Sequence, residues 1–199
     1  MNEKMEKKSE LLVKWLRVLM YIAIANIVNS VVNFLPFVPA AVTTWIGRGI
    51  MLAVAICMFM LASVNERYKK SGMMRAAVLV CTLVTVFLNG SPVLTLAISI
   101  LSIIAVYQEY HAHSELLADK DTKLSRKWQS LFTWGVISGI LVGFGSTVTV
   151  LILSLLEMEL VRLTAIIVGI LSIPQMILDL VYMLYLKKMV SIFENYEVQ

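Results

Sequence analysis

Long apolar runs alternate with short polar connections along the whole chain. A helix needs roughly 20 predominantly apolar residues to cross the hydrocarbon core of a bilayer. The pattern therefore predicts an all-α protein, a polytopic membrane helical bundle of six transmembrane helices that forms one domain over residues 1–199. The predicted helices cover approximately Leu11–Phe34, Thr44–Ser63, Ala76–Leu88, Val93–Val106, Gln129–Leu156 and Leu160–Leu186.

The third and fourth apolar runs, 76–88 and 93–106, are shorter than a full membrane span. Two arrangements fit them: tilted helices, or a re-entrant hairpin that turns at residues 89–92, where Asn, Gly, Ser and Pro follow one another. Either arrangement returns the chain to the side it left, so the predicted topology of the later helices is the same.

The most hydrophilic stretch, Tyr107–Trp128, contains both histidines of the chain. We interpret residues 111–128 as a cytosolic connector. It joins the first four helices, within residues 1–110, to the last two, within residues 129–199. The tail from Lys187 to Gln199 is expected to lie at the membrane interface.

Composition supports a membrane protein. The 199 residues are 59% hydrophobic and 15% charged, and the mean hydropathy is +0.84, which leaves too little polar surface for a soluble domain. The net charge of +4 does not indicate nucleic-acid binding, because the basic residues lie at the ends of apolar runs. Cys57 and Cys81 lie inside apolar runs without CxxC spacing, so neither a disulfide framework nor a metal site follows.

The first residues have the charged and then apolar order of a secretory signal, with a weak cleavage candidate at 38–41. The apolar part continues beyond the usual length of about 7–15 residues. We therefore interpret it as the first membrane helix.

The basic residues predict the orientation. All but two of the seventeen Lys and Arg residues fall on one side of the predicted topology, the exceptions being Arg48 and Arg162. Because basic residues favour the cytoplasmic side, we expect a cell-membrane protein with both termini cytoplasmic and with anionic lipid headgroups against that face. The same side should carry an aromatic belt at headgroup level, formed by Trp15, Tyr68, Tyr107, Tyr110, Trp128 and Tyr185.

Two hairpins of the chain resemble each other. Lys14-Trp15 recurs as Lys127-Trp128 after 113 residues, and Arg48 recurs as Arg162 after 114. This spacing indicates a parallel internal repeat of the first two and last two helices. The alternative is that any two helical hairpins share basic and aromatic ends.

Glycines in the fifth helix recur at i, i+4 and i+8, at Gly135, Gly139 and Gly143. Such a ladder lets another helix approach closely. Under the repeat it coincides with a polar stripe of the first helix, so we expect both faces to turn toward the centre of the bundle. A lipid-facing dimer contact is the alternative.

Polar residues inside the apolar runs are the candidate substrate or ion site. Asn26, Asn29 and Asn33 recur at helical spacing on the first helix, and Gln175 and Asp179 lie in the sixth. A carboxylate in a membrane span is costly unless it is protonated, hydrated or paired. Asp179 is therefore the sharpest candidate for a proton, ion or amine site, and the alternative is a structural ion pair with Arg17 or Lys14.

A weaker candidate is a metal site at His111, Glu115 and Asp119, which would share one helical face. His113 falls off that face and charged faces at a membrane surface are commonly solvated, so we predict no metal. The sequence contains no recognisable catalytic motif, and we predict neither catalytic residues nor a cofactor.

These observations favour a small-molecule or ion transporter, or a solute-binding membrane subunit. One alternative is a non-catalytic scaffold or accessory subunit that binds a membrane protein partner, or a second copy of the chain, through the glycine ladder. Another is a membrane-embedded enzyme that acts on lipid through His111 and His113.

Overall fold

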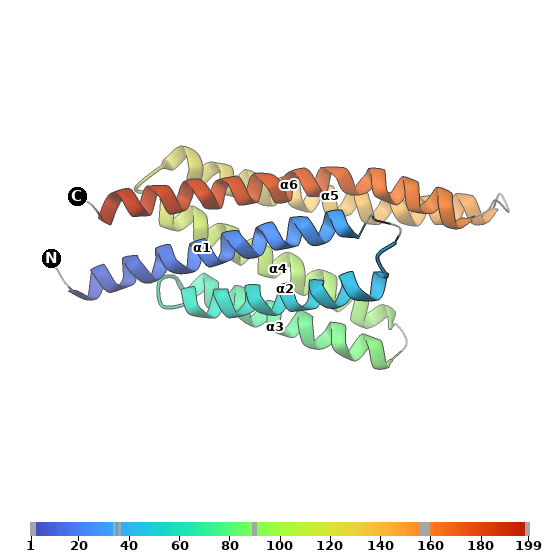
Figure 1. Ribbon diagram of the computed structural model, residues 1–199, viewed down its shortest axis with the longest axis horizontal. Helices are drawn as coiled ribbons and strands as arrows, with labels where there is room; N and C mark the ends of the chain where they lie inside the picture. The colour runs from blue at the N-terminus through green and yellow to red at the C-terminus, as the bar shows by residue number, and fades with distance from the viewer. Residues whose placement is uncertain (1–2, 34, 36, 89–90, 156–159, 198–199) are drawn as a thin grey trace.

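The computed structural model is a bundle of six α-helices (Figure 1), and no strand occurs among the described residues. The all-α prediction is therefore confirmed. The helices are α1 (Glu3–Val32), α2 (Ala40–Leu61), α3 (Glu66–Phe87), α4 (Pro92–Leu117), α5 (Thr122–Leu155) and α6 (Leu160–Glu197).

The structure describes the backbone of residues 3–33, 35, 37–88, 91–155 and 160–197. Within these ranges, side chains are described except at 3–7, 143–144, 146–155, 160–169, 171–172 and 196–197.

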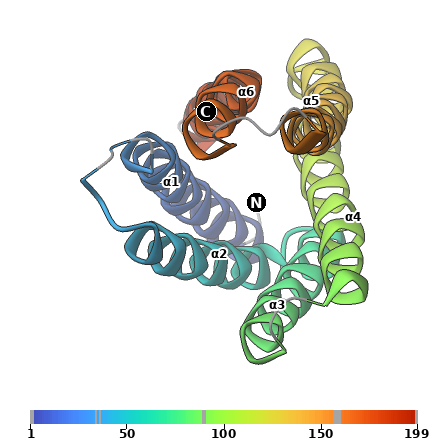
Figure 2. The same cartoon turned by 90° about the vertical axis from the view of Figure 1, so that its right-hand side faces the viewer.

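The six helices form a ring in chain order. Each packs against its neighbours in sequence, and α6 closes the ring against α1, as the end-on view shows (Figure 2). Both chain termini lie at one end of the bundle, which we call the terminal end (Figure 1). At the opposite end α2 and α4 begin, and there α3 and α4 diverge from α5 and α6 (Figure 1).

Four helices are long and apolar enough to cross a membrane, over Lys8–Val32, Ala40–Leu61, Glu66–Phe87 and Pro92–Leu117, in a search limited to the described residues. At 1.5 Å per residue, α3 and α4, with 22 and 26 residues, are roughly 33 and 39 Å long. The re-entrant hairpin is not confirmed. Neither six crossings nor the internal repeat is shown, and both stay predictions.

Helix α4 continues into the hydrophilic stretch. Of the predicted connector 111–128, only residues 118–121 lie outside a helix. One face of the extended helix is apolar or internally paired: Glu109, Ala112, His113 and Leu117 are all fully buried. The cytosolic location of the connector stays a prediction. The chain then turns into α5 at Asp121, whose Oδ1 accepts a hydrogen bond from the backbone N–H of Leu124 at 2.8 Å.

Asp121 also joins two helices at the terminal end, because Lys188 Nζ of α6 lies 2.9 Å from Asp121 Oδ2. The hydrogen bond from Lys188, with the backbone bond from Leu124, lowers the pKa of the Asp121 carboxyl. Helix α6 extends through most of the expected tail, to Glu197. Its residues Met189, Val190 and Phe193 belong to the hydrophobic core, and the interfacial location of the tail stays a prediction.

The core is concentrated at the terminal end. Its members come from α1 as far as Ala23, from the first halves of α3 and α5 and from the last halves of α2, α4 and α6. They include Leu16, Leu61, Leu124 and Leu186. Two residues expected in an outer aromatic belt, Tyr68 and Trp128, are instead fully buried here. Their rings pack inward because both find partners in His113, as described below.

One close helix contact depends on a glycine. A Cβ added at Gly72 of α3 would lie 3.2 Å from Met58 Cβ and 3.3 Å from the ring of Phe59 in α2. The absence of a side chain thus lets α2 and α3 pack closely near the core.

Candidate functional site

A cavity of about 640 Å³ lies in the middle of the helical ring, and all six helices contribute to its lining. Small-molecule sites in proteins commonly have volumes of roughly 300–1,000 Å³. Most of the wall is apolar, with Leu19, Ile22, Val54, Ile103, Phe132 and Val136 among the lining residues. Toward the terminal end the cavity is bounded by the hydrophobic core.

A charged pair forms the floor of the cavity. The Arg75 guanidinium of α3 donates to Glu109 Oε2 of α4, and the Tyr182 hydroxyl of α6 donates to Glu109 Oε1. All three residues line the cavity, although the Glu109 side chain is only 1% exposed. A buried carboxylate needs such partners, because leaving it unpaired in an apolar interior costs several kcal/mol.

A histidine lies on the other side of Glu109. His113 is fully buried, with Nε2 at 3.8 Å from Glu109 Oε1 and Nδ1 at 2.8 Å from the Tyr68 hydroxyl. Nδ1 is within hydrogen-bond distance of the Tyr68 hydroxyl, whereas Nε2 faces Glu109 beyond hydrogen-bond distance and has no hydrogen-bond partner among the described residues. Trp128 packs on the imidazole with ring centroids 4.4 Å apart. We call Arg75, Glu109, His113, Tyr68 and Tyr182 the floor network.

Asp179 lies on the wall of the same cavity. Its two oxygens face neutral amides: Asn26 Nδ2 of α1 lies 3.5 Å from Oδ2, and Gln175 Nε2 lies 3.4 Å from Oδ1. Next to it along α6 is Tyr182, whose ring stacks on that of Tyr110 with centroids 5.6 Å apart. The cavity thus combines a carboxylate with two aromatic rings.

Three of the five predicted site residues are brought together in this cavity: Asn26, Gln175 and Asp179. Asn29 and Asn33 instead join α1 to the start of α2. Asn29 Nδ2 donates to the backbone carbonyl of Thr43 at 3.2 Å, and the Thr43 hydroxyl donates to Asn33 Oδ1 at 2.7 Å. Neither Asn29 nor Asn33 lines the cavity.

The ion pair proposed for Asp179 does not form in this structure. Arg17 pairs with Glu194, and Lys14 is exposed, with Nζ 6.0 Å from the Trp15 ring centroid. Asp179 was predicted to lie too close to the end of the sixth helix, because the predicted helix ends at Leu186 whereas α6 continues to Glu197. Arg17 precedes Asn26 by nine residues, about two and a half turns, so it projects from the opposite face of α1.

The glycines of α5 also face the cavity. Gly135 and Gly139 line it, and a Cβ added at either would meet no atom within 4 Å. These two glycines therefore border open space at the centre of the bundle, where close helix packing had been predicted. At Gly143 only the helix backbone is described.

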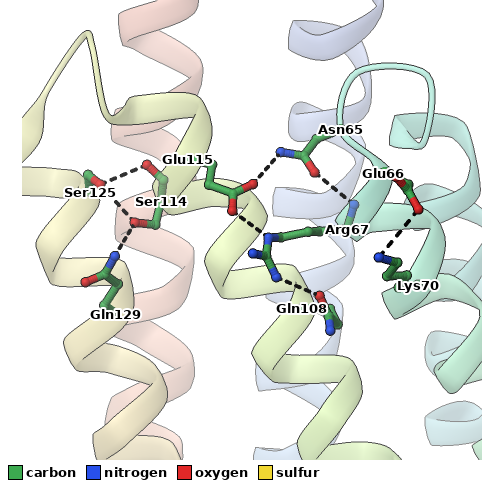
Figure 3. Close-up of polar contacts among 9 residues, drawn as sticks. All are labelled: Asn65, Glu66, Arg67, Lys70, Gln108, Ser114, Glu115, Ser125 and Gln129. Carbon is green, nitrogen blue, oxygen red and sulfur yellow. Dashed lines mark hydrogen bonds and ion pairs between the residues drawn. The ribbon is translucent and has the colours of Figure 1, made fainter.

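The predicted metal candidates do not gather in one site. Figure 3 shows that Asn65 and Arg67, at the start of α3, donate hydrogen bonds to Glu115. His111 instead packs on Tyr107, with ring centroids 4.2 Å apart. Asp119 is exposed after the end of α4. No group of three His, Cys, Asp or Glu side chains that could hold a metal ion occurs among the described residues.

Sequence reasoning missed the floor network. Arg75 was counted among the basic residues that mark the cytoplasmic side, and Tyr68 was assigned to the membrane surface. The one available signal was the i, i+4 spacing of Glu109 and His113 on a helix. That spacing places both side chains on one face, but only the packed helices show that the face is buried.

Polar contacts join the helices around the terminal end. In addition to the ion pairs of Arg17 with Glu194 and of Lys188 with Asp121, the α4–α5 contact includes three polar side chains (Figure 3). Ser114 and Ser125 have hydroxyl oxygens 2.9 Å apart, and Gln129 Nε2 donates to Ser114 Oγ at 3.0 Å. This end of the ring is closed by both core packing and polar contacts.

Comparison with protein families, with curated protein sequences and with solved structures finds no match to this chain. The helical chain, with several apolar helices long enough to span a bilayer, is compatible with a membrane protein.

Proposed function

We propose that this chain is a membrane transporter, or a solute-binding membrane subunit, that holds a small molecule in the central cavity. The observation that carries the proposal is the cavity itself, about 640 Å³ in volume and lined by all six helices. Apolar walls with a few converging polar groups are typical of small-molecule sites. Here the polar groups are Asn26, Gln175 and Asp179 on the wall and the floor network below.

The distribution of charge suggests which side the ligand comes from. If the basic terminal end is cytoplasmic, the closed part of the ring faces the cytosol and the cavity belongs to the outer half of the protein. This arrangement corresponds to a state that captures solute from outside. Release into the cytosol would require the terminal-end contacts to separate.

The two other functions have less support. A scaffold that binds its partner through the glycine ladder does not agree with Gly135 and Gly139 bordering the cavity. A lipid enzyme that uses His113 does not agree with its complete burial against Trp128 and Tyr68.

The test is a thermal-unfolding screen of the purified protein with a broad panel of small solutes. We expect at least one solute to raise the unfolding temperature of the wild type. Gly139→Leu should abolish that shift, since the new side chain would occupy the cavity without a steric clash at its Cβ.

Asn29→Leu is the matched control, because Asn29 contacts Thr43 outside the cavity; this variant should keep the shift even if its own stability falls. The proposal fails if no solute stabilises the wild type, or if Gly139→Leu responds to the solutes as the wild type does.

A further inference from the structure

The charges of the cavity do not balance. Three charged side chains line it: Arg75, Glu109 and Asp179. Arg75 and Glu109 form an ion pair with each other. The contacts of Asp179 are the amide groups of Asn26 and Gln175, both neutral and at the long distances of 3.5 and 3.4 Å. One carboxylate therefore lines the cavity without a cationic partner among the side chains that the structure describes.

An ionised carboxylate in such a place is costly unless it is hydrated or a positive charge joins it, because the surrounding wall is mainly apolar. The amide donors orient the carboxylate and still leave it able to accept further hydrogen bonds. A positively charged ligand would supply both the missing charge and the missing donors.

The neighbouring rings favour a cation as well. Tyr182 follows Asp179 by three residues on α6, so both side chains lie on the same helical face. The ring of Tyr182 stacks on that of Tyr110, and both line the cavity beside Asp179. Aromatic faces attract ammonium groups, most strongly where water is excluded.

The composition of the cavity favours a cation over an anion and provides no transition-metal site. A transition-metal ion is usually held by several His, Cys or carboxylate side chains, and no group of three such side chains exists in the described part of the chain. An inorganic or organic anion would meet Asp179, while the Arg75 charge is already neutralised by Glu109.

We propose that the cavity binds an organic cation, an amine or quaternary ammonium with an apolar body, whose charge pairs with Asp179 beside the rings of Tyr110 and Tyr182. This inference rests on the proposed function and specifies its substrate class.

The experiment compares cations with neutral molecules of the same shape. Binding to the purified protein is measured by calorimetry for choline, benzyltrimethylammonium and a series of longer alkyl ammonium ions. Each is paired with an isostere in which carbon replaces the charged nitrogen, such as 3,3-dimethylbutan-1-ol for choline. We expect the cations to bind at least tenfold more tightly than their neutral counterparts.

Asp179→Asn should remove this preference, because it keeps the shape and the hydrogen-bonding capacity of the side chain and removes only the charge. Asp119→Asn, which changes an exposed acid at the terminal end outside the cavity, should leave cation binding unchanged. The comparison of isosteres on the wild type remains decisive even if Asp179→Asn does not fold.

The remaining outcomes each overturn a specific statement. If neutral solutes bind in the cavity as well as cations, the substrate class is wrong while the proposed function stands. The same holds if a neutral solute binds with a pH dependence that Asp179→Asn abolishes, since Asp179 would then be a proton site. If neither these probes nor any solute of the broad panel binds, the proposed function itself fails.

Discussion

At the scale of single residues, Glu109 shows how the position of a charge decides its role. Its carboxylate lies beneath the cavity, paired with Arg75, hydrogen-bonded by Tyr182 and near His113. Buried ion pairs contribute little net stability compared with apolar residues of similar volume, but removing one partner leaves an uncompensated charge. The floor network is therefore most vulnerable to single substitutions.

Arg75→Met should lower the free energy of unfolding by about 3–5 kcal/mol, because Glu109 then remains charged and buried without its cation. The double variant Arg75→Met/Glu109→Leu should recover most of that loss. Equilibrium unfolding in mild detergent measures both values. A double variant that is no more stable than Arg75→Met alone would contradict the ion-pair account.

At the scale of the elements, helix packing depends on where glycines are placed. Gly72 allows α2 and α3 to approach closely, whereas Gly135 and Gly139 of α5 face open space in the cavity. The sequence presents all three as small residues in apolar helices. Only the structure separates a packing glycine from one that leaves room for a ligand.

Gly72→Leu should destabilise the bundle by roughly 1–3 kcal/mol, the usual cost of overpacking, because its Cβ would lie within 3.3 Å of Met58 and Phe59. Gly49→Leu is the matched control on α2, since a Cβ there would meet no atom within 4 Å. Thermal unfolding of the two variants in the same detergent makes the comparison. Equal effects would show that Gly72 does not determine the α2–α3 contact.

At the scale of the whole molecule, the ring is closed at the terminal end and holds its cavity toward the opposite end. Interhelix polar contacts join α1 to α6, α5 to α6 and α4 to α5 at the closed end. Alternating access in membrane transporters proceeds by movement of packed helices around a fixed site. Under the proposed function, the structure described here is one extreme of such a cycle.

This arrangement predicts a pattern of chemical accessibility. In a background with Cys57→Ala and Cys81→Ala, a membrane-impermeant thiol reagent applied to intact cells should label Ser102→Cys in the cavity and Ala41→Cys at the start of α2. Leu124→Cys, in the core, should not react, and Asp119→Cys should react only after permeabilisation. Labelling of Asp119→Cys in intact cells would reverse the proposed orientation.

Much of the fold was predictable from single residues and their spacing. The apolar runs predicted six helices, because a helix in lipid must satisfy its backbone hydrogen bonds internally. The helix ends were less accurate. Helices α4 and α6 extend through polar sequence as far as Leu117 and Glu197, because one face of each helix packs against the core.

The candidate site was predictable only in part. Asn26, Gln175 and Asp179 were recognisable because a polar side chain in an apolar helix needs a partner or a cavity. Arg75, Glu109 and His113 lie close to hydrophilic stretches, where a charged residue is ordinarily solvated, so nothing local marked them as buried.

The sequence by itself determined that this chain forms apolar helices and which of its membrane residues are polar, because both follow from the solvent that each stretch can tolerate. The tertiary structure decided which of these polar and charged side chains contact each other. It placed Arg17 against Glu194 and Arg75 against Glu109, and it left Asp179 facing the cavity beside two amides. Such pairing depends on the rotation and depth of each helix against its neighbours, which the spacing along one helix does not contain.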